Sequence, residues 1–500
     1  MKRVGNLYNS MISYKRLEEV YAGVMKGKHR KNMPGSIAFM IRNNKEYYMH
    51  EAGRLLSERS FKPSKPKESY RYDKGSGKLR HIKAPKLFPD QFIHWSIVLA
   101  LKDEVFLKGM DHWCCASVKG RGTLYAKNFI EKTLDDSNDE GKGSKAVRRK
   151  YKYCLKMDIK KFFDNIDRDI LMNKLSRKVK DKEMLELCRK IIYSVSGTGI
   201  PLGYYTSQWF ANFYLQDFDH WLREVAMPKY GVSIYARYMD DMIILGSNKR
   251  KLRQLQEEIQ NHLKANFKLE LKNTSTVFAI ADQDIDFIGF KFSYGKTTLR
   301  KKILHNMKLA NHQLYKGKFT LEKLQKSNAY NGWGMNSDTK QYIAKYLNGN
   351  RKLENMKMAE MMNESRREYM ASEDYAHTLK VEQDMKNIKV GEEHNNEHVL
   401  VRYYGVTDEV RIVARTKFAF PDYEEVMKER EQEKLDRIER KKEKKKKRKS
   451  RRKSDNYYYP TAEIYMSNRD KDEVIRDYND RIKEHNALEE QLFNEFYLPA

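Results

Sequence analysis

Two adjacent aspartates, Asp240 and Asp241, lie between two apolar runs in the segment YARYMDDMIILG. Carboxylates are costly to remove from water, so a pair enclosed by apolar residues indicates a bound cation. A third carboxylate, Asp158, follows another apolar run in LKMDIKKFFDNI. Three such groups could hold two Mg²⁺ ions, one activating an attacking 3′ hydroxyl and one bridging triphosphate oxygens. An isolated Asp-Asp pair is usually a solvated turn, but the apolar flanks and Asp158 favour nucleotidyl transfer.

These carboxylates need strands and turns that bring them together. Side chains alternate along a strand, so a tight turn at the pair would let Asp240 face a cleft with Asp241 beside it. Around them the pattern predicts a strand (KYCLKMDI), two helices (FFDNIDRDILMNKL and SQWFANFYLQDFDHWLREV), a hairpin (SIYARYMDDMIILG), a helix over residues 251–269 and short strands to about residue 300. Strands and helices in this order predict an α+β sheet domain.

The flanking segments are mostly helical. Residues 1–65 have helical spacing, SYRYDKGSGKLRHIKAP predicts a hairpin carrying cations, and residues 88–107 are again helical. The polar stretch DDSNDEGKGSKAVRRK predicts a surface loop. Beyond residue 300 the sequence favours a helical bundle, then a strand pair in VLVRYYGVTDEVRIVARTKFAF and a charged helix from Glu424.

Composition indicates a polyanionic partner. There are 99 Lys and Arg against 69 Asp and Glu, a net charge of +30, and the tract from Arg440 to Lys453 accounts for only part of it. The four cysteines contain no CxxC pair, and no run of 18 apolar residues or secretory signal is visible. We therefore expect a soluble, cytoplasmic protein without a membrane partner.

Several motifs, in order along residues 65–345, resemble those of reverse transcriptases. LKMDIKKFFDNI, GIPLGYYTSQWFANFYLQDFDHWL and YARYMDDMIILG are similar to three palm motifs, and DFIGFKF to the strands that grip the primer. SGKLRHIKAP and SVKGRGTLYA resemble fingers motifs, and AYNGWG resembles the thumb helices of bacterial members. The resemblance implies an α+β right-hand polymerase, with fingers, an antiparallel palm sheet and a helical thumb, followed by a charged C-terminal extension.

The resemblance also implies roles for single residues. Asp158, Asp240 and Asp241 would hold two Mg²⁺ ions, which Mn²⁺ can replace. Phe163 falls where the family places an aromatic gate against the ribose 2′ hydroxyl, although it could instead be a core ring like Phe162. The dNTP would also meet Lys78, Arg80, Ser207, Gln208 and Lys272. Gln208 could equally face solvent, and Lys272 stands in LKNTS, where the family's adjacent Lys-Thr is separated.

The second motif favours a bacterial subgroup. It reads Pro201-Leu202-Gly203, then Thr206-Ser207-Gln208, where retroviral and intron enzymes carry Pro-Gln-Gly. This resembles the defence-associated and diversity-generating enzymes, and no endonuclease or ribonuclease H signature is visible. We expect cDNA synthesis from a dedicated noncoding RNA in anti-phage defence, with diversity generation as the alternative. A non-catalytic RNA-binding scaffold is the third possibility.

The expected partners are template RNA, the cDNA product and dNTPs, with homo-oligomerisation left open. Nucleic acid would contact Arg121 and the basic tract at Lys444, Lys445, Lys446, Lys447 and Arg448, unless that tract is only a solvated tail. Tyr457, Tyr458 and Tyr459 are candidate protein primers, or rings that stack on bases. The expected segments are a helical N-terminal segment (residues 1–65), the fingers and palm (66–300), the thumb helices (301–350), an accessory domain (351–423), a basic helix (424–456) and a C-terminal segment (457–500).

Overall fold

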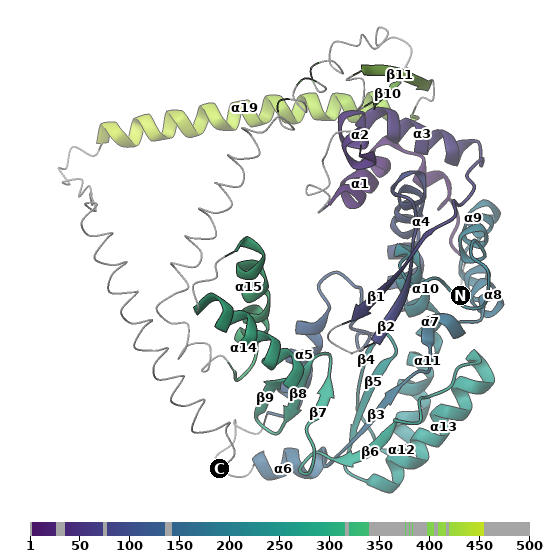
Figure 1. Ribbon diagram of the computed structural model, residues 1–500, viewed down its shortest axis with the longest axis vertical. Coiled ribbons are helices and arrows are strands. Elements are labelled where there is room, and N and C mark those ends of the chain that lie inside the picture. Colours follow the sequence, from purple (N-terminus) through teal and green to yellow (C-terminus); the bar gives the residue numbers. More distant parts are fainter. Residues whose placement is uncertain are drawn as a thin grey trace. The chain divides into compact units, whose positions relative to one another are not determined.

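The computed structural model describes residues 3–26, 36–73, 78–135, 143–315, 320–339, 376, 380, 383, 398–404, 409–416 and 420–454. The chain divides into two compact units, whose helices and strands are labelled in Figure 1. The first contains Met1–Arg300 and Tyr369–Tyr423, and the second contains Lys301–Glu368 and Glu424–Ala500. Each unit is described by itself below.

A four-stranded antiparallel sheet forms the centre of the first unit. Its order is β4-β5-β3-β6, with bounds Ile234–Tyr238, Asp241–Gly246, Tyr153–Asp158 and Thr276–Ala279. Met242, Ile243, Ile244 and Leu245 of β5 are all buried, so this central strand is covered on both faces. Helix α13 (Lys249–Phe267) packs against β3 and β6. Its buried residues, Leu252, Leu255, Ile259 and Leu263, recur at the three- and four-residue spacing of one helix face.

Two further antiparallel sheets lie within residues 66–300 of the first unit. A hairpin is formed by β1 (Lys67–Asp73) and β2 (Lys78–Ala84), and a three-stranded sheet by β7 (Ile285–Phe287), β8 (Phe290–Ser293) and β9 (Lys296–Leu299). The hairpin was predicted from alternating residues around a turn and the later strands as short strands with turns, and both predictions are confirmed. The expected strand pair near residue 400 is also confirmed as β10 (His398–Tyr404) and β11 (Glu409–Thr416).

Helices supply the remaining core of the first unit. Their bounds are α1 Tyr14–Met25, α2 Ile37–Asn43, α3 Lys45–Ser57, α4 Phe92–Leu101, α5 Thr123–Thr133, α6 Gly143–Lys150, α7 Phe162–Asn165, α8 Arg168–Lys178, α9 Lys182–Ile192, α10 Tyr205–Tyr214, α11 Gln216–Trp221 and α12 Met227–Tyr230. Short helical segments at Asn9–Met11, Leu87–Gln91, Lys102–Leu107 and Leu222–Ala226 complete the set. The prediction of a loop over the polar stretch was wrong in part, because residues 143–150 form α6.

Residues 420–422, far along the chain, pack against the N-terminal helices. Asp422 accepts hydrogen bonds from the backbone N–H groups of Tyr14 (2.6 Å) and Lys15 (3.3 Å), at the first turn of α1. The buried ring of Phe420 meets Tyr14 edge-on at 5.1 Å and His50 at 4.4 Å. Residues 420–422 therefore complete a core that begins near the start of the chain.

The second unit contains α14 (Lys301–Tyr315), α15 (Leu321–Met335) and most of α19 (Tyr423–Ser454). Helices α14 and α15 share a buried polar network. The Asn311 side chain donates to Asn331 at 3.1 Å and accepts from Ser327 at 2.6 Å. The charged helix expected from residue 424 is present as α19. Among the residues that the structure describes, no helix has the length and apolarity needed to span a bilayer.

Candidate active site

The central sheet brings the three predicted carboxylates to one end. Asp158 ends β3 and Asp241 begins β5, and these two residues are directly paired across the antiparallel ladder. Asp240 occupies the β4–β5 turn, where its carbonyl accepts a hydrogen bond from Ile159 N–H at 3.2 Å. Residues that lie far apart in the sequence therefore meet because adjacent strands end at the same edge.

The turn that presents Asp240 has an unusual backbone. Met239 has φ of 58°, a left-handed conformation that side-chain-bearing residues seldom adopt. Its carbonyl accepts a hydrogen bond from Arg237 Nη1 at 3.1 Å. The turn is therefore held by a side chain from the strand immediately before it.

Arg237 itself is fully buried and held on several sides. Its guanidinium donates to both carboxylate oxygens of Asp219 on α11, at 2.8 and 2.5 Å, and to Asn212 Oδ1 at 3.1 Å. Tyr235 also donates to Asp219, at 2.8 Å. Sequence reasoning missed this cluster. The available signal was an arginine within an apolar strand, since a buried guanidinium needs a carboxylate partner.

The electrostatics of the site disfavour ionised carboxylates. Burial, followed by the neighbouring charge of Asp158, raises the pKa of Asp240 to about 6. Burial also raises the pKa of Asp241 to about 7, despite the opposing effect of Lys156, and the charges of Asp158 and Asp240 add to the rise. Such crowding is what a bound cation would relieve.

Three cations flank the aspartates. Lys272 forms an ion pair with Asp158 and donates its backbone N–H to the Asp158 carbonyl at 2.8 Å. Lys156 Nζ lies 3.9 Å from Asp241 Oδ1 and donates to the Asp286 carbonyl, while Arg300 binds the Asp286 carboxylate at 2.5 and 2.8 Å. The altered spacing at LKNTS therefore does not keep Lys272 from the site.

The carboxylate oxygens fit a divalent metal, although they do not form a preassembled metal site. Asp241 Oδ1 is buried without a hydrogen-bond donor, and carboxylate oxygens are the ligands that Mg²⁺ prefers. Within the described ranges, no three His, Cys, Asp or Glu side chains converge closely enough to form a ready-made metal site. Lys272 instead neutralises part of the charge of Asp158. Asp158, Asp240 and Asp241 are the residues that would hold the metal.

Phe163 is held through its backbone and by an edge-on contact of its ring with the Phe162 ring at 5.6 Å. Its carbonyl accepts a hydrogen bond from Ile200 N–H at 2.8 Å, and its side chain is half-buried, whereas the neighbouring Phe162 is buried as predicted. Gly199 has φ of +71°, and a Cβ there would lie 2.2 Å from the Phe163 carbonyl oxygen. The second motif thus needs glycine at this position to approach Phe163.

The second motif also anchors the β1–β2 hairpin. Lys83 N–H donates to the Leu202 carbonyl at 2.8 Å, and a Cβ on Gly203 would lie 2.6 Å from the Lys83 carbonyl oxygen. Further along, Ser207 is buried in α10, while Gln208 is exposed and accepts from Ser117 Oγ at 3.1 Å. Gln208 therefore faces the 117–122 loop.

The other predicted contacts are placed as follows. Lys78 and Arg80 lie on β2, and Arg80 is exposed. Arg121 donates to the carbonyls of Asp111 (2.6 Å) and Cys114 (3.1 Å), which fixes the loop that carries it. Residues 444–448 lie in α19, but their side chains are outside the described part of the structure, as are Tyr457, Tyr458 and Tyr459 altogether.

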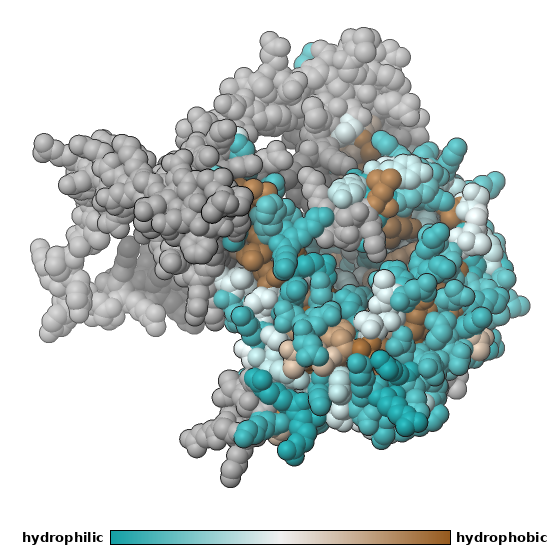
Figure 2. All heavy atoms as spheres, turned by 60° about the horizontal axis from the view of Figure 1, so that its bottom comes forward, coloured by the Kyte–Doolittle hydropathy of each residue, from teal (hydrophilic) through white to brown (hydrophobic). Residues whose placement is uncertain are grey.

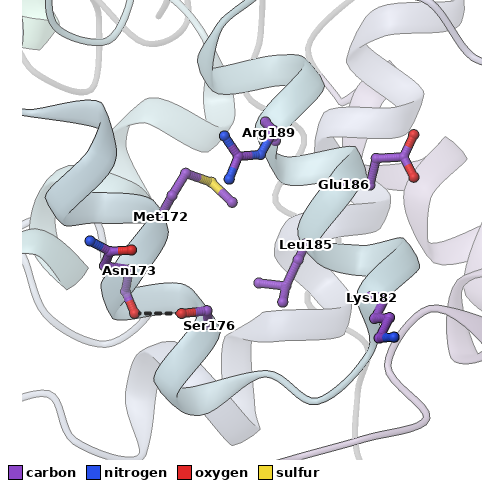
Figure 3. Close-up of a pocket in the computed structure, with 7 residues that line it drawn as sticks. All are labelled: Met172, Asn173, Ser176, Lys182, Leu185, Glu186 and Arg189. Atoms are coloured by element: carbon purple, nitrogen blue, oxygen red, sulfur yellow. Dashed lines mark hydrogen bonds between the residues drawn. The ribbon is translucent and has the colours of Figure 1, made fainter.

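A separate groove of about 350 Å³ lies between α8 and α9 (Figure 3). Met172 and Leu185 are its apolar residues, and it is also lined by Asn173, Ser176, Lys182, Glu186 and Arg189. None of the predicted site residues lines it. The described surface in Figure 2 is mostly hydrophilic, as the charge content leads one to expect.

The sheet brings the paired aspartates and the flanking lysines together at one edge. Residues 74–292 match the family model described as "Reverse transcriptase (RNA-dependent DNA polymerase)". The chain is also 26% identical, over 203 residues, to the retron Ec73 reverse transcriptase of Escherichia coli, a match that covers 38% of this chain and 63% of the relative. Residues 74–292 of this chain are therefore similar to reverse transcriptase domains, and the chain spans less than two thirds of the length of the retron relative.

Among solved structures, telomerases show weak similarity. Apo telomerase from Candida tropicalis aligns at a TM-score of 0.38 and 12% identity, covering 73% of this chain and 75% of the telomerase. Telomerase from Candida albicans with a telomeric RNA fragment aligns at a TM-score of 0.34 and 11% identity, covering 69% and 71%. Scores this low support no conclusion about this chain.

Proposed function

We propose that this protein copies RNA into DNA at the site formed by Asp158, Asp240 and Asp241. The observation that carries the proposal is the direct pairing of Asp158 with Asp241, beside Asp240, at one end of the central sheet. In the reaction, the primer 3′ oxygen forms a bond to the α-phosphorus of a dNTP. The bond from that phosphorus to the bridging oxygen breaks, and pyrophosphate leaves.

The chain's own residues position the reactants and manage charge. Asp158, Asp240 and Asp241 hold the divalent cations, for which we propose two Mg²⁺ ions, replaceable by Mn²⁺. The bound cations supply Lewis acidity at the triphosphate and lower the pKa of the primer hydroxyl. Lys272 is close enough to Asp158 to reach the same reacting region and is the candidate proton donor to the leaving pyrophosphate.

The remaining residues select and hold the nucleotide. Phe163, fixed by Ile200 and Gly199, restricts space at the ribose 2′ position and so favours deoxynucleotides. Lys78 and Arg80, on a hairpin tied to the second motif, bind the triphosphate by charge-assisted hydrogen bonds. Gln208 and Arg121, around the 117–122 loop, contact the template.

The test is the Asp240→Asn variant with labelled dNTPs, a primed RNA template and Mg²⁺. Loss of a metal ligand's charge should abolish DNA synthesis, while RNA affinity should stay near that of the wild type because it depends on dispersed cations. Asp282→Asn, at an exposed turn, is the matched control and should remain active. Synthesis above a few per cent of the wild type in Asp240→Asn would remove Asp240 from the site.

For the biological role, we propose synthesis from a dedicated noncoding RNA in anti-phage defence. The similarity to a retron reverse transcriptase favours this role over diversity generation. As a test, the RNA that copurifies with the protein is sequenced. Plaque formation is then compared on cells that express the wild type or Asp240→Asn. One structured RNA and protection lost in Asp240→Asn are expected. Protection that persists in Asp240→Asn would favour the RNA-binding scaffold instead.

A further inference from the structure

The β1–β2 hairpin has two chemically different faces. Its register pairs Tyr70 with His81 and Tyr72 with Leu79, and it pairs Arg71 with Arg80. Because side chains alternate along each strand, the first two pairs share one face and the arginine pair lies on the other. Among the described residues, the hairpin forms a sheet of two strands, and no third strand pairs with it (Figure 1).

The arginine face is turned toward the second motif. Ile82 shares that face, and a Cβ on Gly203 would lie 3.0 Å from the Ile82 side chain. The opposite face, made by Tyr70, Tyr72 and Leu79, is therefore turned away from this contact, and we call it the tyrosine face. The proposed nucleotide site uses only the arginine side of the hairpin.

The tyrosine face is open to solvent. Tyr70, Tyr72 and Leu79 are 68%, 60% and 65% exposed. Single exposed apolar residues are normal, but three on one face of a two-stranded ribbon indicate a binding surface. The Tyr70 ring is already oriented, because it stacks on His81 at 4.7 Å with the planes 13° apart, and His81 contacts Glu68 at 2.9 Å.

We propose that the tyrosine face binds single-stranded RNA by stacking bases on Tyr70 and Tyr72. Tyr70 turns one ring face toward His81 on the neighbouring strand, which leaves its opposite face for a base. Tyr72 lies about 6.8 Å further along the strand, so a second base can stack on its ring. The ligand class rests on the proposed function, in which the protein copies RNA.

Charge favours this occupant over a protein. Residues 62–86 contain nine Lys and Arg against two acidic residues, so phosphates are attracted along the whole hairpin. Arg71 and Arg80 lie at the ribbon's other face, where like charges directly opposite each other favour an anion nearby. Flat rings flanked by cations are the usual surface for unpaired bases.

The test measures RNA affinity without metal or dNTPs, so it does not depend on catalysis. Fluorescence anisotropy in EDTA would compare wild-type full-length protein, Tyr70→Ala/Tyr72→Ala and Tyr70→Phe/Tyr72→Phe, using a labelled single-stranded 20-mer RNA and its duplex. We expect the double alanine variant to lose roughly tenfold or more in affinity for the single strand and little for the duplex. The double phenylalanine variant keeps both rings and should stay within about twofold of the wild type.

Three results would overturn the inference. They are unchanged single-strand affinity in the double alanine variant, equal losses for single strand and duplex, and wild-type self-association that this variant abolishes while RNA affinity stays the same. Circular dichroism checks folding, and the single variant Tyr72→Ala replaces the double one if that variant unfolds. The wild type could fail to make DNA while the double alanine variant still loses affinity for single-stranded RNA. That result would refute only the proposed function.

Discussion

Replacing Arg237 should separate the stability of the sheet from the geometry of its catalytic turn. Arg237→Met keeps a long side chain but leaves Asp219, which is only 1% exposed, without its charge partner. Breaking a buried ion pair in this way costs about 3–5 kcal/mol. That is a large share of the roughly 5–15 kcal/mol that stabilises a typical domain.

The variant also removes the hydrogen bond that holds the turn. The Met239 carbonyl loses a charged donor at 3.1 Å, an interaction typically worth about 1.5–3 kcal/mol. If that energy keeps Asp240 in place during the reaction, DNA synthesis should fall by roughly 10- to 100-fold, since each 1.36 kcal/mol corresponds to tenfold.

The double variant Arg237→Met/Asp219→Asn distinguishes the two effects. It removes both buried charges, and the amide oxygen introduced by Asp219→Asn can still accept from Tyr235, so the free energy of unfolding in urea should recover much of the loss. DNA synthesis should stay low, because the Met239 carbonyl still lacks its donor, and the Mg²⁺ concentration for half-maximal activity should rise. Full recovery of synthesis would refute the positioning role. A wild-type unfolding free energy in Arg237→Met would show that the ion pair contributes nothing.

Two further predictions concern the carboxylates and the aromatic gate. In EDTA, the pKa values of Asp240 and Asp241 in the folded protein are about 6 and about 7, whereas the ordinary value for aspartate is 3.8. The folded state therefore binds these protons more tightly than the unfolded state, and the protein should become less stable as the pH rises from about 4 to 7. Urea unfolding between pH 4 and 8 should show this fall relative to Asp240→Asn/Asp241→Asn, and parallel curves would contradict it. Phe163→Ala should raise ribonucleotide incorporation in a competition between rNTPs and dNTPs, whereas Phe162→Ala, at a buried ring, should mainly lower stability by about 3–5 kcal/mol. An unchanged nucleotide preference in Phe163→Ala would assign that ring to the core.

The sequence allowed prediction of those features that depend on local pattern. The strands ending at Asp158 and beginning at Asp241 were visible as apolar runs, and α13 as a regular helical stripe. The pairing of Arg237 with Asp219 could not be predicted, because it requires knowing how α11 packs on the sheet. Residues 143–150 were missed because a short, charged helix has no apolar periodicity to detect.

The return of residues 420–422 to α1 has a consequence for biosynthesis. Tyr14 emerges from the ribosome about 400 residues before the side chains that cap and cover it, Asp422 and Phe420. At roughly 5–20 residues per second, that interval is about 20–80 seconds. During this time Phe420 has not yet been made and cannot cover Tyr14 and His50, although the residues of the helices that carry them have been synthesised. The N-terminal helices can therefore reach their final packing only after residues 420–422 have been made, and chains interrupted before Phe420 would carry an unfinished core available to chaperones and proteases.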